Sequence, residues 1–152
     1  RALHITRVRD AQDECIQNGY PTPGFLAFIP WTFQPDNTNL KRDKVSPEQY
    51  LKTLAISRIM LDNIKNFQAS WVTMGPEIGK LSLSYGCNDF GSTMIEENVV
   101  SAAACTHKVN TNLILRLIRE AGKIPAKRNT NYDILHVYGE NETVENDFIL
   151  QN

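Results

Sequence analysis

The sequence has few cysteines and histidines, and none of them is spaced for a shared site. Its 152 residues contain three cysteines and three histidines: Cys15, Cys87 and Cys105, with His4, His107 and His136. An odd number of widely separated cysteines predicts neither a disulfide framework nor a Cys-x-x-Cys metal site. The isolated histidines form no metal-ligand pair. We therefore expect reduced thiols and no metal bound by this chain.

Long apolar runs and an excess of one charge are also missing. No apolar run approaches the roughly 18 residues that a membrane-spanning helix needs, and the first residues lack the order of a signal peptide. Lys and Arg number 16 against 17 Asp and Glu, so the formal net charge is -1. This balance gives no electrostatic reason to expect nucleic acid or an anionic membrane as partner. The composition predicts an ordinary soluble domain, with the cytoplasm as the default location.

Three apolar segments of strand length alternate with helical patterns. The first, 24–30, is apolar throughout, which is typical of a parallel strand buried on both faces. The others are 67–72 and roughly 87–90. Parallel strands joined by helices form an open doubly wound sheet or a barrel. The pattern therefore predicts an α/β fold with about three βα units, less than half of a complete barrel of about 250 residues.

Capping residues predict where the helices begin and end. Ser46, Pro47 and Gln49 form a capping box, and the helix that follows should place Ile59 on a wide apolar face and end at 62–63. Further helices are expected at 3–18, 76–86, 96–104 and 111–121.

The C-terminal part is less clearly patterned. The segment 132–138 fits a strand or a helical turn, and the pattern does not decide between them. From Gly139 onward acidic residues occur without basic ones, which predicts a mobile acidic tail at 139–152, distinct from 1–138.

Polar side chains are concentrated where the expected strands end. Behind the first strand the stretch 31–38 contains Pro35, which excludes a strand interior, so it is a ligand-binding loop or only a surface loop. Behind the third strand, polar residues exceed what a helix cap requires, which indicates that several face a ligand. These residues are Asn88, Asp89, Ser92 and Thr93. The simpler alternative is a turn followed by glutamates 96–97 at the positive end of a helix dipole.

Four stretches, 28–38, 50–63, 68–73 and 88–100, resemble in the same order one family of radical S-adenosylmethionine enzymes. These enzymes act in the futalosine route to menaquinone and cyclise dehypoxanthine futalosine. The resemblance covers about 9–132 and implies the C-terminal portion of a TIM-type (β/α) barrel, about three βα units plus C-terminal helices. It also implies hydrogen abstraction from the substrate ribose by a 5′-deoxyadenosyl radical. Aminofutalosine synthase and deazaflavin-chromophore synthase are sister branches that differ at the Trp31 loop and at 91–93.

The family's C-x-x-x-C-x-x-C motif, whose thiolates hold a [4Fe–4S] cluster, does not occur in the sequence. The cysteines present are too far apart to replace it. The resemblance therefore implies S-adenosylmethionine and the cluster as cofactors of the full-length parent, and an inactive fragment. Cys87 and Asn88 stand where relatives have small and acidic residues, and 18–23 lengthens the approach to the first strand.

The resemblance and the strand-end positions together imply substrate-positioning roles, with no catalytic residue assigned. Asp89 would accept hydrogen bonds from ribose hydroxyls, and Trp71 would stack on an aromatic ring. The expected lining of the pocket is Trp31, Thr32, Gln34, Asn37, Ser70, Trp71, Asn88, Asp89, Ser92 and Thr93.

Two other kinds of function stay open from the sequence. A structural half-barrel would expose strand edges and pair with the missing N-terminal half-barrel or with a second copy. A binding module would hold a small nucleoside without chemistry. Binding of futalosine-like ligands and the mass in solution would separate these possibilities.

Overall fold

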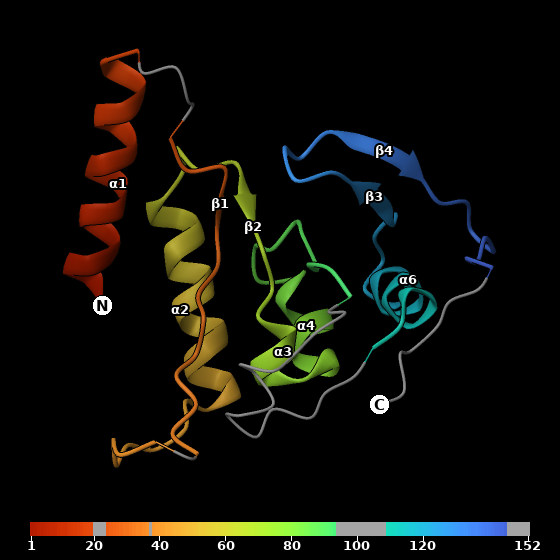
Figure 1. The fold of residues 1–152 in the computed structure, drawn as a ribbon, viewed down its shortest axis with the longest axis horizontal. Helices are drawn as coiled ribbons and strands as arrows, with labels where there is room; N and C mark the ends of the chain where they lie inside the picture. Colours follow the sequence, from red (N-terminus) through yellow and green to blue (C-terminus); the bar gives the residue numbers. More distant parts are fainter. Residues whose placement is uncertain (20–23, 37, 94–108, 146–152) are drawn as a thin grey trace.

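The computed structural model describes residues 1–19, 24–36, 38–93 and 109–145 (Figure 1). No helix in these ranges is both long and apolar enough to cross a membrane. The elements in chain order are α1 Ala2–Gln17, β1 Ala27–Phe28, α2 Pro47–Met60, β2 Asn66–Phe67, α3 Trp71–Met74, α4 Pro76–Ser82, α6 Thr111–Glu120, β3 Ala126–Arg128 and β4 Ile134–Val137.

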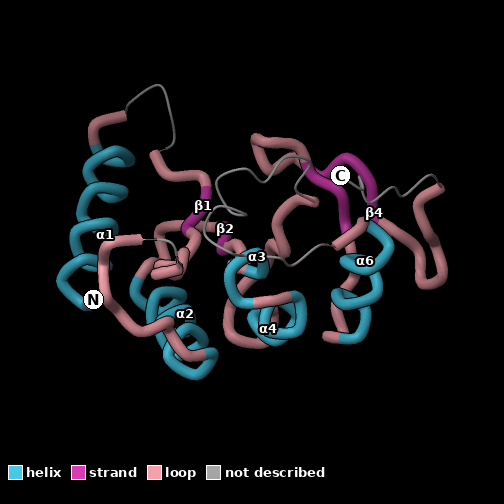
Figure 2. Tube along the Cα trace, turned by 60° about the horizontal axis from the view of Figure 1, so that its bottom comes forward, coloured by secondary structure: helices cyan, strands magenta, loops and turns pink. Residues whose placement is uncertain are grey.

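The short strands β1 and β2 run parallel and lie beside a row of helices. Ala27 pairs with Asn66 and Phe28 with Phe67. Figure 2 shows α2, α4 and α6 following one another on one side of these strands, and in both views α1 lies outermost, next to α2. Parallel strands with helical connections confirm the mixed α/β class.

The first strand is shorter and more exposed than predicted. Only Ala27–Phe28 of the segment 24–30 pairs with another strand. Phe25, Leu26 and Ile29 are 46%, 41% and 37% exposed, so the prediction of burial on both faces was wrong. Within the described ranges β1 is bonded to β2 alone, and the helices gather on one side, which leaves its other edge and face open.

The second predicted strand ends early, and the third is a single bridge. Trp71 and Val72 belong to the helical turn α3 instead of a strand. The Ser70 N–H donates to the buried Tyr50 hydroxyl at 2.9 Å, and this bond takes the chain out of the ladder. Only Asp89 of 87–90 pairs, through a parallel bridge with Gln68.

Most helix boundaries follow the capping signals. Ser46 Oγ accepts from Gln49 N at 3.2 Å, and Asn110 Oδ1 accepts from Leu113 N at 2.9 Å. Two details were predicted wrongly: α4 ends at Ser82, well before Gly86, and Ile59 is 79% exposed, at the edge of a face on which Tyr50 and Leu54 are buried. The predicted helix 96–104 lies outside the described residues.

The core joins α2, β2, α3 and α6. Its largest side chains with almost no exposure are Trp71, Tyr50, Phe67, Leu54, Leu61, Ile64 and Leu117. Burial raises the pKa of Tyr50 above its ordinary value, so its hydroxyl stays neutral at physiological pH. The core therefore fixes the end of β2, from which the polar residues of the site follow.

An antiparallel hairpin and a polar strap follow α6. The segment 132–138, left open by the sequence, contains β4, which pairs with β3. Arg119 Nη2 donates to the Gly139 and Glu142 carbonyls, at 2.6 and 2.8 Å, and Asn112 exchanges two hydrogen bonds with the Val144 backbone. The described part of the acidic stretch, 139–145, is thus bonded to α6, while mobility of 139–152 stays a prediction.

Gly79 should be intolerant of substitution because α4 passes very close to Trp71. A Cβ at this position would lie 2.7 Å from Trp71 Cβ and 3.0 Å from Phe90 Cζ. Overpacking costs about 1–3 kcal/mol, more than the roughly 1 kcal/mol that alanine gains in a helix. We expect Gly79→Ala to lower the free energy of unfolding in urea titrations. Gly139→Ala, whose Cβ would lie 3.7 Å from Glu142, is the control, and equal stability of the two variants would contradict the expectation.

Candidate functional site

Polar side chains gather in two neighbouring clusters at the ends of the strands. The hydroxyl cluster comprises Thr32, Gln34, Ser70 and Thr73, which follow β1 and β2. The carboxylate cluster comprises Asp89, Gly91, Arg128 and Tyr132. The next residues in the chain after Ser70 and Asp89 are Trp71 and Phe90, which stack with ring centroids 6.5 Å apart and an interplanar angle of 24°.

The hydroxyl cluster ties the ends of β1 and β2 together. Thr32 Oγ1 donates to Thr73 Oγ1 at 2.7 Å, and Ser70 Oγ lies 2.8 Å from the same Thr73 oxygen. Gln34 Nε2 donates to Thr32 Oγ1 at 3.2 Å. Thr32 and Ser70 are 6% and 1% exposed. Buried hydroxyls that bond one another in this way are satisfied and rigid.

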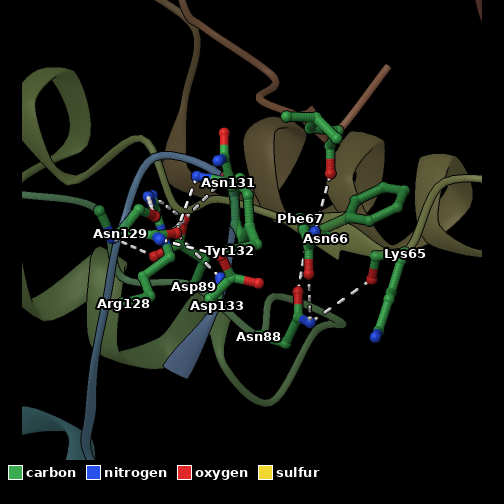
Figure 3. Close-up of polar contacts among 12 residues, drawn as sticks. Lys65, Asn66, Phe67, Asn88, Asp89, Arg128, Asn129, Asn131, Tyr132 and Asp133 are labelled. Atoms are coloured by element: carbon green, nitrogen blue, oxygen red, sulfur yellow. Dashed lines mark hydrogen bonds and ion pairs between the residues drawn. The ribbon is translucent and has the colours of Figure 1, made fainter. Parts of the chain in front are cut away.

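The carboxylate cluster joins the bridge at Asp89 to the β3–β4 hairpin (Figure 3). Asp89 Oδ2 accepts from Arg128 Nη2 at 2.6 Å, from Arg128 Nε at 3.2 Å and from the Tyr132 hydroxyl at 3.0 Å. Asp89 Oδ1 accepts from the Gly91 N–H at 3.0 Å. The side chains of Asp89 and Arg128 are 9% and 25% exposed. Hydrogen bonds between a carboxylate and a guanidinium are among the stronger ones in proteins, so this pair fixes the position of both side chains.

Tyr132 is held in an unusual backbone conformation. Its φ is 68°, which no other described residue except glycine shares. The Asn129 side chain accepts from the N–H groups of Asn131 and Asp133, and the Asn129 carbonyl accepts from Tyr132 N at 3.2 Å. A bulky residue in this region costs about 1–3 kcal/mol and persists only where its surroundings fix it. Such strain is concentrated at functional sites.

The pKa shifts define the charges of the cluster. Burial and the neighbouring Asp89 charge raise the pKa of Tyr132 to about 12, so the hydroxyl keeps its proton at neutral pH and donates a hydrogen bond to Asp89. Burial lowers the pKa of Arg128, but the hydrogen bond and charge of Asp89 outweigh this effect and raise it overall. Burial, with a contribution from Asp89, raises the pKa of Cys87 to about 12. Cys87 is therefore a neutral thiol and no nucleophile.

The other predicted site residues lie in different surroundings. Trp31 is 52% exposed, whereas Trp71 is 1% exposed and its ring is buried against Phe90. Asn88 Oδ1 accepts from Phe67 N at 2.8 Å and so supports the end of β2. Ser92 is exposed and Thr93 half-buried. Asn37 lies outside the described residues, and the substrate-positioning roles of the whole set stay predictions.

Sequence reasoning missed Thr73, Arg128 and Tyr132. The spacing Ser70-x-x-Thr73, typical of a local turn with paired hydroxyls, could have indicated the first. Arg128 and Tyr132 follow Asp89 by 39 and 43 residues, and a lone basic residue on a short strand gives no signal of its partner.

The described residues do not fit an iron–sulfur cluster. Across the ranges that the structure covers, no three His, Cys, Asp or Glu side chains come together as metal ligands. The described cysteines are Cys15, half-buried, and Cys87, buried and neutral. Cluster ligation needs several thiolates in one compact loop.

Comparison with known proteins identifies relatives along the entire chain. Residues 22–140 match the family model "CofH/MqnC C-terminal region". The chain is 66% identical, over its full length, to 40% of the cyclic dehypoxanthine futalosine synthase of Halalkalibacterium halodurans. Its identity to the Streptomyces coelicolor enzyme of that name is 47%; the matched region covers 92% of this chain and 34% of that enzyme. Its identity to the aminodeoxyfutalosine synthase of Thermus thermophilus is 34%; the matched region covers 91% of this chain and 37% of that enzyme.

The chain thus spans between about a third and two fifths of the length of these relatives. The family model matches well over half of the chain, across both clusters of polar residues. The chain therefore belongs to the CofH/MqnC C-terminal region family.

Proposed function

We propose that this chain is part of a radical S-adenosylmethionine enzyme that cyclises dehypoxanthine futalosine in the futalosine route to menaquinone. The observation that carries the proposal is 66% identity over the whole chain to a cyclic dehypoxanthine futalosine synthase, against 34% to an aminodeoxyfutalosine synthase. The sister activities are therefore the weaker alternatives. In the parent enzyme S-adenosylmethionine and a [4Fe–4S] cluster would supply the radical, outside the residues described for this chain.

The part that these residues would play is to hold the substrate and exclude water. Polar side chains follow the ends of β1 and β2 and the bridge at Asp89. The buried, stacked rings of Trp71 and Phe90 come directly after Ser70 and Asp89. In (β/α) barrels substrates bind at this end of the strands, and positioning a substrate for a radical contributes more than acid–base chemistry here. The proposal includes a TIM-type barrel in the parent enzyme, a substrate pocket partly lined by this chain, and a cytoplasmic location.

The direct test is turnover by the full-length enzyme with a reconstituted cluster. Under anaerobic conditions with S-adenosylmethionine and a reductant, we expect dehypoxanthine futalosine to be converted to its cyclic product, detected by mass spectrometry. The 152-residue chain alone, which lacks the cysteine motif, should yield no product. Conversion of the substrates of a sister enzyme, with none of dehypoxanthine futalosine, would refute the assignment.

Asp89→Asn should impair the full-length enzyme. The change removes the charge that accepts from Arg128 and Tyr132. Because hydrogen bonds to charged groups contribute about 1.5–3 kcal/mol, kcat/KM should fall roughly 10- to 100-fold. Glu140→Gln, which makes the same kind of change at an exposed position, should leave kcat/KM unchanged. Equal kcat/KM for wild type and Asp89→Asn would remove Asp89 from the site.

We also propose that the open edge of β1 pairs with another half-barrel or, in the isolated chain, with a second copy. Exposed apolar residues directly before and after β1 support this, since open strand edges favour association. Light scattering of the 152-residue chain should give a mass above 17.2 kDa that falls on dilution. Ile29→Lys should shift the mass toward the monomer and Leu40→Lys, in the exposed loop, should not. A monomer at all concentrations would contradict the proposal.

A further inference from the structure

The carboxylate of Asp89 has most of its acceptor capacity already used. A carboxylate offers about four lone-pair positions on two oxygens. Three donor groups reach Oδ2: Arg128 Nε, Arg128 Nη2 and the Tyr132 hydroxyl. One donor, the Gly91 N–H, reaches Oδ1. Among the described residues one acceptor position, on Oδ1, therefore has no donor.

The main chain of Asp89 is fixed on both sides. Its N–H donates to the Phe67 carbonyl at 3.1 Å, and its carbonyl accepts from Ala69 N at 2.9 Å. With the backbone held to the end of β2, the side chain can turn only if it breaks its bonds to Arg128 and Tyr132. These two residues thus decide which way Oδ1 points.

Arg128 and Tyr132 are held in turn by each other and by Asn129. The guanidinium carbon of Arg128 lies 4.0 Å from the centre of the Tyr132 ring, and Arg128 Nη1 donates to the Asn129 carbonyl at 3.0 Å. In Figure 3 the Asn129–Asp133 turn closes over Asp89 from the hairpin side. The positive φ of Tyr132 is part of this turn.

The Oδ1 atom lies at the start of the 91–93 segment, since it accepts from the Gly91 N–H. Gly91 has φ 98°, and a Cβ there would come within 2.9 Å of Gln68 Nε2 and 3.4 Å of Trp71 Nε1. The missing side chain of Gly91 thus makes room for Gln68 and Trp71, which pack against this glycine. Any larger residue at 91 would push these two side chains, and with them the backbone N–H that holds Oδ1.

We propose that Arg128 and Tyr132 are positioning residues that orient Asp89 so that Oδ1 accepts one hydrogen bond from a substrate hydroxyl. The inference rests on the proposed function and narrows it. Asp89 accepts a hydrogen bond from one substrate hydroxyl, whereas the sequence predicted bonds from several. Because an ionised carboxylate only accepts, the position selects a donor group such as a ribose hydroxyl. Arg128 neutralises Asp89, so the carboxylate is not free to bind a cation.

The test is a double-mutant cycle on the full-length enzyme, read by calorimetric binding of dehypoxanthine futalosine and by KM and kcat. Tyr132→Phe removes one donor and should weaken binding about 3- to 10-fold, with KM rising and kcat changing less. Arg128→Lys keeps the charge but loses the planar guanidinium that donates from both Nε and Nη2, and it should weaken binding further. In an Asp89→Ala background, Tyr132→Phe should have no additional effect, because it acts through Asp89.

Matched controls lie on the same hairpin. Lys127→Gln, exposed next to Arg128, and Tyr138→Phe, whose ring contacts His136, should leave affinity and KM unchanged. If Asp89→Ala does not purify in a folded form, Asp89→Ser completes the cycle.

The outcomes separate this inference from the proposed function. A wild-type enzyme that neither binds nor converts dehypoxanthine futalosine overturns the proposed function, and this inference with it. A wild type that binds, with Tyr132→Phe equal to wild type, overturns the positioning role alone. If Tyr132→Phe weakens binding equally in the wild-type and Asp89→Ala backgrounds, the positioning role is also overturned, since the effect is then a general structural one.

Discussion

The site depends on the double attachment of Asp89. Its backbone bonds to the end of β2, while its side chain bonds to a hairpin that follows α6. Among the described residues, the side-chain hydrogen bonds that join the hairpin to the strand ends all go to Asp89. Because the ion pair with Arg128 is largely shielded from water, its geometry matters more than that of an exposed pair.

The buried side chains and the polar clusters have distinct tasks. Leu54, Phe67 and Trp71 lose almost all contact with water and supply most of the driving force that holds α2, β2 and α3 together. The hydroxyls of Thr32, Ser70 and Thr73 contribute little net energy, but an unpaired member would be costly. Their mutual bonds therefore specify the arrangement of the strand ends more than they stabilise it.

Local signals in the sequence predicted the local structure well. Ser46 caps α2 as its capping box indicated, and α4 and α6 begin at the predicted positions, Pro76 and Thr111. Strand lengths were overestimated because they depend on neighbours: the Tyr50 hydroxyl, 20 residues before Ser70, ends the second strand. Asp89 was found because polar residues cluster around it. Arg128 and Tyr132 were not, since the contact joins distant segments and no short pattern encodes it.

One position at the base of the site is defined by the lack of a side chain. Gly79 lets α4 lie directly against the stacked rings of Trp71 and Phe90, which directly follow Ser70 and Asp89 in the chain. A larger residue there fits only if Trp71 or Phe90 becomes smaller or moves. Substitutions at positions 71, 79 and 90 should therefore depend on one another, both among natural relatives and in engineered variants.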